Sequence, residues 1–103
     1  LACDLRIAVP SAQFFYPVMR LGYRPQPSDP IRLAALVGPA RAKMILLAGQ
    51  RIAADEAQTW GLIDRIVPPE SLTDIAMSLA EHACAADPGH VAALKRMSNG
   101  EPA

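Results

Sequence analysis

Two tyrosines at the edges of a proline-rich stretch are the first residues whose chemistry suggests proton transfer. Tyr16 and Tyr23 each carry a phenol that can in principle donate a proton. A tyrosine beside a loop more often packs its ring and leaves its hydroxyl in water, and we favour that interpretation. The nearest acids, Asp4 and Asp29, flank residues 5–28, which contain no carboxylate. The sequence therefore indicates no carboxylate pair for acid–base chemistry in this segment.

The histidines and cysteines form no recognisable catalytic or metal-binding pattern. His82 and His90 have no nucleophile and carboxylate at matching spacing, so we expect both to be solvated or to lie at helix ends. Cys3 and Cys84 lie near opposite ends of the chain and belong to no C-x-x-C motif. We predict neither a disulfide framework nor a metal site, and we expect Cys84 to be a small buried or half-buried helix residue.

Length and charge favour one small domain with no marked electrostatic partner. The 103 residues include ten Lys and Arg against ten Asp and Glu, so the formal net charge is zero. Nucleic acid and anionic lipid require clustered Lys and Arg, which this sequence lacks. The longest apolar runs have five residues, far fewer than the ~20 of a membrane-spanning helix. We expect a cytoplasmic protein that binds neither nucleic acid nor a membrane.

The first residue is Leu1 where a translated chain normally has methionine. We expect from this that the chain is processed, starts at an unusual codon, or is a piece of something longer. Asp4 and Arg6 interrupt the first apolar positions, so the opening residues do not resemble a cleavable leader.

Periodicity and helix-terminal residues predict an α-rich α/β chain. Apolar alternation over residues 1–9 and a β-rich run at 62–67 predict one or two strands. Four prolines within residues 17–30 predict a loop, which ends where Asp29 and Pro30 have the residue types of an N-cap and a first helical position. Apolar spacing and glycine positions predict about five helices, at residues 30–37, 39–49, 54–60, 70–85 and 91–97.

Three side chains of these predicted helices have structural rather than catalytic interpretations. Trp60 precedes a glycine that suits a helix end, and we expect it to anchor the core or an interface. Lys95 and Arg96 are able to contact the phosphate of an adenine nucleotide. A solvated helix C-terminus, where the macrodipole favours positive charge, is the interpretation we prefer for this pair.

Several segments, taken in order and spacing, resemble the crotonase (enoyl-CoA hydratase/isomerase) superfamily. The likeness begins with LACDLRIA at residues 1–8 and passes through AQF, YP, LG and RL between residues 12 and 33. It continues with LVGPARA at 36–42, LLAGQRIAADEA at 46–57 and WGLIDRIVP at 60–68. Each piece alone is weak, but together they cover nearly the whole chain. The resemblance implies the C-terminal part of a crotonase-like ββα-superhelix fold, as one partial domain over residues 1–103.

The resemblance also implies a substrate class and places this chain's residues in the family's site. Members bind acyl-CoA thioesters and stabilise the thioester enolate with two backbone N–H groups, and hydratases add two glutamates. The segments with the oxyanion donors and the first glutamate precede residue 1, and Val18 stands where the second glutamate follows Pro17. Tyr16, Pro17, Val18 and Gly22 match acyl-pocket positions. Coenzyme A is part of the substrate, so no separate cofactor and no metal is expected.

These departures lead to three interpretations. The one we favour is a remnant of an enzyme that acted on 2-enoyl-CoA in fatty-acid breakdown, inactive and marginally stable by itself. The second is a non-catalytic subunit that docks on a longer crotonase-like partner or forms a homo-oligomer. The third is an acyl-CoA lyase or isomerase completed by another chain. A helix-turn-helix at residues 56–62 is disfavoured, because Pro68 and Pro69 would fall in its recognition helix and the net charge is zero.

Overall fold

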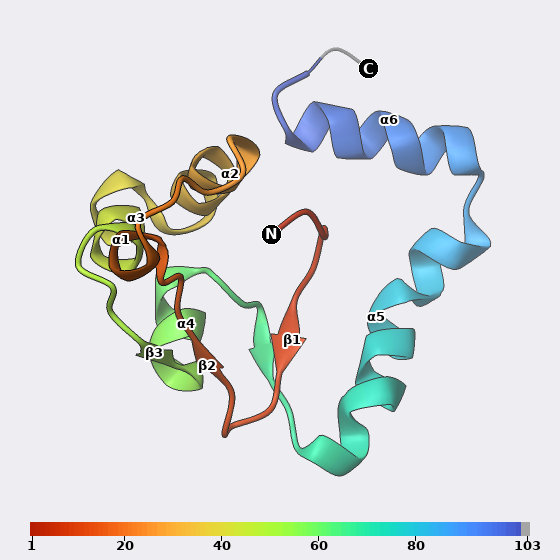
Figure 1. Cartoon of the computed structure of the whole chain (residues 1–103). Helices are drawn as coiled ribbons and strands as arrows, with labels where there is room; N and C mark the ends of the chain where they lie inside the picture. Colours follow the sequence, from red (N-terminus) through yellow and green to blue (C-terminus); the bar gives the residue numbers. More distant parts are fainter. Residues whose placement is uncertain (102–103) are drawn as a thin grey trace. The chain divides into compact units, whose positions relative to one another are not determined.

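The computed structural model describes residues 1–101, which divide into two compact units, Leu1–Leu72 and the residues from Thr73 onward (Figure 1). The described part is helix-rich, as predicted, with six α-helices, one 3₁₀ turn and four two-residue strands. The sequence predicts a single domain, and that stays a prediction, because the structure divides into two compact units. The elements of the first unit are β1 (Ile7–Ala8), β2 (Gln13–Phe14), α1 (Val18–Leu21), α2 (Ser28–Val37), α3 (Pro39–Leu46), β3 (Ile52–Ala53), α4 (Ala54–Trp60), β4 (Arg65–Ile66) and the 3₁₀ turn Pro69–Ser71. The second unit consists of α5 (Leu72–Ala85), whose first residue closes the first unit, and α6 (Pro88–Ser98).

Two small sheets lie in the first unit (Figure 1). In one, β1 pairs in parallel with β4, with Ile7 opposite Arg65. In the other, β2 pairs antiparallel with β3, with Phe14 opposite Ile52. The sequence predicts only one or two strands because two residues are too few to produce a readable alternation, and β2 and β3 are therefore missed.

The first strand is much shorter than the predicted residues 1–9. Before β1 the chain is held by contacts of Arg6 and not by a sheet ladder. The Arg6 backbone N–H donates to Asp64 Oδ2 at 2.8 Å, and its guanidinium donates to the carbonyl of Cys3 at 2.5 Å. The predicted strand at 62–67 shortens to β4 because Leu62 and Ile63 belong to the turn after α4, where both N–H groups donate to the Ala57 carbonyl at 2.9 and 3.3 Å.

A four-residue helix, α1, lies where the prolines predict only a loop. Pro17 occupies its N-cap, a position where the missing proline N–H removes no helical hydrogen bond. Gly22 ends it in the left-handed conformation, with φ 78°, and donates its N–H to the Val18 carbonyl at 2.9 Å. Prolines thus flank this helix and do not interrupt it.

The next two helices begin and end differently from the prediction. α2 begins at Ser28 with Pro27 as N-cap, so Asp29 is not the N-cap but lies in the first turn. Its carboxylate is directed to a side chain from another segment, described below, and not to the helix end. α2 and α3 pack against each other and meet at Gly38, whose φ of 88° and ψ of 156° belong to an extended region open essentially to glycine, not to the predicted left-handed C-cap. α3 ends at Leu46, short of the predicted Gly49.

The turn after α4 agrees with the prediction. Gly61 has φ 88° and ψ 9°, the left-handed conformation that glycine adopts without steric cost. It also passes close to α2, because a Cβ at this position would lie 2.8 Å from the carbonyl oxygen of Leu36. The turn therefore requires glycine for two independent reasons.

The core of the first unit lies where α2, α3 and α4 meet the strands. Ile52 in β3 and Ala57 in α4 are fully buried, and Leu33 from α2 and Ile45 from α3 are nearly so. Trp60 is half-buried and packs against this cluster, which confirms the predicted core anchor. Its ring lies 5.4 Å from the guanidinium of Arg41 on α3.

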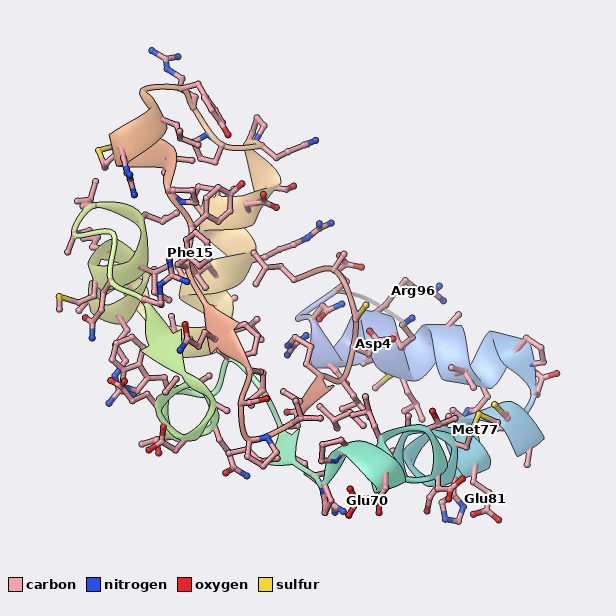
Figure 2. The ribbon with its side chains drawn as sticks, turned by 60° about the horizontal axis from the view of Figure 1, so that its bottom comes forward. Asp4, Phe15, Glu70, Met77, Glu81 and Arg96 are labelled. Carbon is pink, nitrogen blue, oxygen red and sulfur yellow. The ribbon has the colours of Figure 1, made fainter. Side chains whose placement is uncertain are left out.

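The second unit consists of two helices without a buried residue. Met77 and Glu81 both project from α5 (Figure 2). Cys84 on this helix is exposed, so the expectation that it is buried or half-buried is wrong. The best covered apolar residues of α5 are only half-buried, and Cys84 is more exposed than they are. α6 begins at Pro88, earlier than predicted, because Asp87 caps it by accepting from the His90 N–H at 3.2 Å. Within residues 1–101 no helix has both the length and the apolarity to cross a bilayer.

Candidate functional site

A hollow of about 640 Å³ opens in the first unit, and we regard it as the candidate site. Most of its wall is apolar and comes from elements distant in sequence, because the sheets and helices of this unit converge there. The apolar residues include Ile7 of β1, Phe14 of β2, Leu33 of α2 and Ile45 of α3, with Leu62 and Ile63 from the turn after α4. This volume lies in the range of pockets that take small organic ligands.

A phenol and a carboxylate meet at the wall of this hollow. Tyr16, which follows β2, donates its hydroxyl to Oδ2 of Asp29 in the first turn of α2, with 2.6 Å between the two oxygens. Both residues are half-buried. The hydrogen bond to the carboxylate is the largest cause that raises the pKa of Tyr16 above 10.0, and loss of solvent around the phenol adds to it. Tyr16 therefore keeps its proton throughout the neutral range and serves as the donor in this pair.

Two arginines supply positive charge at the same wall. Arg32 lies three residues after Asp29 on α2, and residues at that spacing occupy one face of a helix. Arg6 is more restrained, because its Nε donates to the Leu62 carbonyl at 2.7 Å and another guanidinium N–H donates to Cys3. Arg6 thus holds segments of the wall together through hydrogen bonds, whereas Arg32 is exposed and able to approach a bound ligand.

The rim of the hollow carries an aromatic ring that sequence reasoning did not identify. Phe15 directly follows β2 (Figure 2). It lines the hollow, and about half of its surface is exposed. The guanidinium of Arg51 lies 4.0 Å from its ring centroid, a favourable cation–π distance. Arg51 precedes β3, so the antiparallel pairing of β2 with β3 brings the two together. No periodic signal in the sequence marks such a pair.

The four residues predicted for the acyl pocket do not all reach the hollow. Tyr16 lines it. Pro17 caps α1, Gly22 ends α1 at the exposed surface, and Val18 is 2% exposed and packs inward. None of these three is among the residues that line the hollow. The roles that the sequence assigns to them stay predictions.

The remaining candidates are not among the residues that line the hollow. Cys3 is exposed, His82 lies exposed on α5, and His90 lies in the first turn of α6. Lys95 and Arg96 occupy the last turn of α6, the helix-end position expected for them. In the part of the chain that the structure describes, no three His, Cys, Asp or Glu side chains gather as a metal ion requires.

Comparisons with known proteins agree on one family. The family model described as enoyl-CoA hydratase/isomerase matches residues 1–101. The chain is 43% identical over 81 residues to a short-chain-enoyl-CoA hydratase of Clostridioides difficile, covering 79% of this chain and 52% of that protein. It is 35% identical over 97 residues to a carnitinyl-CoA dehydratase of Citrobacter koseri, covering 94% of this chain and 37% of that protein.

A solved structure shares the fold. The enoyl-CoA hydratase of Bacillus anthracis superposes with a TM-score of 0.85 at 36% sequence identity, over 96% of this chain and 39% of that one. The chain thus spans between about a third and a half of the length of these relatives.

Proposed function

The chain belongs to the enoyl-CoA hydratase/isomerase family, and from that premise we propose that it binds the acyl part of a coenzyme A thioester but does not hydrate an enoyl-CoA by itself. The observation that carries the proposal is the hollow of the first unit, which combines an apolar wall with a phenol–carboxylate pair and two arginines. An apolar wall suits an acyl chain, and a few convergent polar groups suit the thioester end.

The proposed lack of hydratase activity rests on the groups that this chain has for proton transfer. Hydration of an enoyl thioester requires proton transfer from water and to the carbon next to the thioester carbonyl. The family resemblance assigns that work to two glutamates, and at one of the two positions this chain has the isopropyl group of Val18, which cannot exchange a proton. Among the residues that line the hollow, Asp29 is the one carboxylate. Loss of one acid–base group typically lowers a rate by about 100-fold to 10,000-fold.

Binding is tested by titrating the chain with butyryl-CoA in a calorimeter, with free coenzyme A as the reference ligand. We expect butyryl-CoA to bind with higher affinity than coenzyme A. The variant Phe15→Ala removes an aromatic ring from the wall. We expect it to lower the affinity for butyryl-CoA roughly tenfold, because part of an aromatic contact is lost. Leu21→Ala is the matched control, because Leu21 is similarly exposed but does not line the hollow. Equal affinity for butyryl-CoA and coenzyme A would contradict acyl binding.

Hydration is tested separately by following the absorbance of a short enoyl-CoA mixed with the chain. We expect the enoyl absorbance to fall no faster with the chain present than in the solution without protein. Loss of the enoyl absorbance in proportion to the concentration of the chain would overturn the inactivity while leaving acyl binding intact.

The exposed apolar side chains of the second unit favour a second candidate function, a subunit that docks on a longer member of the same family. Met77 is 65% exposed, and Leu94 and Met97 on α6 are about half exposed. Covering such side chains is favourable by about 25 cal/mol per Å² of apolar surface. Sedimentation of the chain with a longer family member tests this: co-sedimentation supports docking, and two separate boundaries oppose it. Enoyl absorbance measured on the same mixture tests whether the two chains together form an active acyl-CoA enzyme.

A further inference from the structure

We propose that Asp29 is the proton-transferring carboxylate of the hollow and that Tyr16 is the residue that positions it. The proposal rests on the proposed acyl-CoA binding and adds a chemical step to it. Its substrate class is a coenzyme A thioester with a hydrogen on the carbon next to the thioester carbonyl, and its step is the reversible removal of that hydrogen as a proton.

The geometry of the pair assigns the two roles. The hydroxyl of Tyr16 has a single proton, and at 2.6 Å from Oδ2 of Asp29 that proton is directed to the carboxylate. Tyr16 therefore does not present a proton to a ligand. The phenol engages one carboxylate oxygen, and Oδ1 is the oxygen with which Asp29 can take a proton from a ligand. A short bond to an ionised acceptor fixes the rotamer of the carboxylate more firmly than a neutral bond does.

The surroundings of Asp29 fit this role. Asp29 lies at an apolar wall, where an ionised carboxylate interacts more strongly with a bound ligand than it does in water. Arg32, on the same face of α2, supplies a positive charge beside it. When the proton leaves the substrate carbon, negative charge develops on the thioester oxygen, and a cation at the same wall stabilises that charge.

The step is balanced without any further reactant. Asp29 Oδ1 forms a bond to the hydrogen of the substrate carbon, and the electron pair of the broken C–H bond forms the C=C bond of the enolate. The C=O pair moves to the thioester oxygen as negative charge. In the reverse direction the carboxylic acid returns its proton to carbon, and in heavy water it first exchanges that proton for a deuteron.

The test is deuterium uptake by butyryl-CoA in heavy water in the presence of the 103-residue chain, measured by mass spectrometry, with the thioester affinity of each protein measured in parallel. We expect uptake above the rate without protein, and a loss of about 100-fold in Asp29→Asn, which keeps the shape but cannot accept the proton. Asp29→Glu keeps the carboxylate and should retain part of the rate. The matched control is Asp55→Asn, which changes an exposed acid in the first turn of α4, away from the hollow.

The positioning role of Tyr16 has its own signature. Tyr16→Phe should lower the uptake rate at saturating thioester about tenfold, the order expected for one hydrogen bond to a charged group, while the affinity changes less than twofold. A merely structural role would change the affinity as well. Far-ultraviolet circular dichroism confirms that each variant retains the helical signal of the parent chain.

The outcomes separate this proposal from the proposed function. Butyryl-CoA binding with equal uptake in the parent chain and Asp29→Asn overturns the role of Asp29 and leaves acyl binding standing. If the parent chain binds butyryl-CoA but deuterium uptake does not exceed the rate without protein, the role of Asp29 is likewise overturned and acyl binding stands. Absence of binding overturns both proposals. Binding with uptake that falls in Asp29→Asn and persists in Asp55→Asn supports both.

Discussion

Replacement of Gly61 by alanine should destabilise the chain by about 2 to 5 kcal/mol, for two reasons that the structure separates. The first is conformational: Gly61 has φ 88°, where a side chain costs about 1 to 2 kcal/mol. The second is steric: the new Cβ would lie 2.8 Å from the carbonyl oxygen of Leu36. This oxygen belongs to the backbone of α2 and cannot rotate away, and such overpacking costs about 1 to 3 kcal/mol.

Gly22→Ala is the control that isolates the conformational cost. Gly22 has φ 78°, close to that of Gly61, but a Cβ built there meets nothing within 4 Å. We expect Gly22→Ala to cost about 1 to 2 kcal/mol, so the two variants should differ by about 1 to 3 kcal/mol.

The assay is urea unfolding of the parent chain and both variants, followed by far-ultraviolet circular dichroism. Trimethylamine N-oxide, held at one concentration, favours the compact state and gives all three proteins a folded baseline. A difference between the two variants of less than about 0.5 kcal/mol, the error of such comparisons, would refute the reasoning, because α2 would then have moved aside at no cost. Loss of the cooperative transition in Gly61→Ala alone would agree with it.

Four further predictions follow from the phenol–carboxylate pair, from the core and from the second unit. In Tyr23→Phe, where one phenol remains, ultraviolet absorbance should report a pKa for Tyr16 above 10.0, and adding Asp29→Asn should bring it back towards 10.0, since the carboxylate is the largest cause of the shift. Because the pKa of Tyr16 is raised in the folded chain, the stability linked to this shift is fully present below pH 10 and is lost as the pH rises through the folded pKa. Tyr16→Phe has no such phenol, so its free energy of unfolding in urea should not show this alkaline loss. Ile52→Ala removes a fully buried side chain and should cost about 2 to 5 kcal/mol, whereas Ile31→Ala, at a position 72% exposed, should cost less than about 0.5 kcal/mol in the same unfolding assay. Without osmolyte the chain should melt over a broad temperature range, because the second unit contributes no buried residue, and a sharp transition by circular dichroism would contradict this.

The family and five of the six described helices could be predicted from the sequence because their signals are spread over many residues. The crotonase resemblance depended on ordered segments between residues 1 and 68, and the family match over residues 1–101 confirms it. The glycine after Trp60 predicts the end of α4 correctly, because a left-handed turn there has few alternatives to glycine. The amphipathic spacing at residues 70–85 predicts α5 to within two residues at its start.

The elements that the sequence did not predict depend on contacts between distant residues. The two-residue strands β2 and β3 have no period of their own, and each exists only because the other lies beside it. Asp29 has the residue type of an N-cap, and its bond to Tyr16 is fixed by the path of the intervening loop, which local propensity does not encode. The absence of carboxylates from residues 5–28 therefore suggested no acid near Tyr16, although the fold places one there.

The pairing of β1 with β4 has a consequence for the order of folding. Arg6 bonds to the backbone and side chain of residues up to 58 positions away, whereas α2 and α3 are neighbours in sequence. Contacts between sequence neighbours close small loops and form early, and the loop that β1 must close is the most costly in entropy. The segment before β2 should therefore dock last and open first. Because Ile7 and Arg6 form part of the wall, the hollow is complete only once the rest of the first unit has folded.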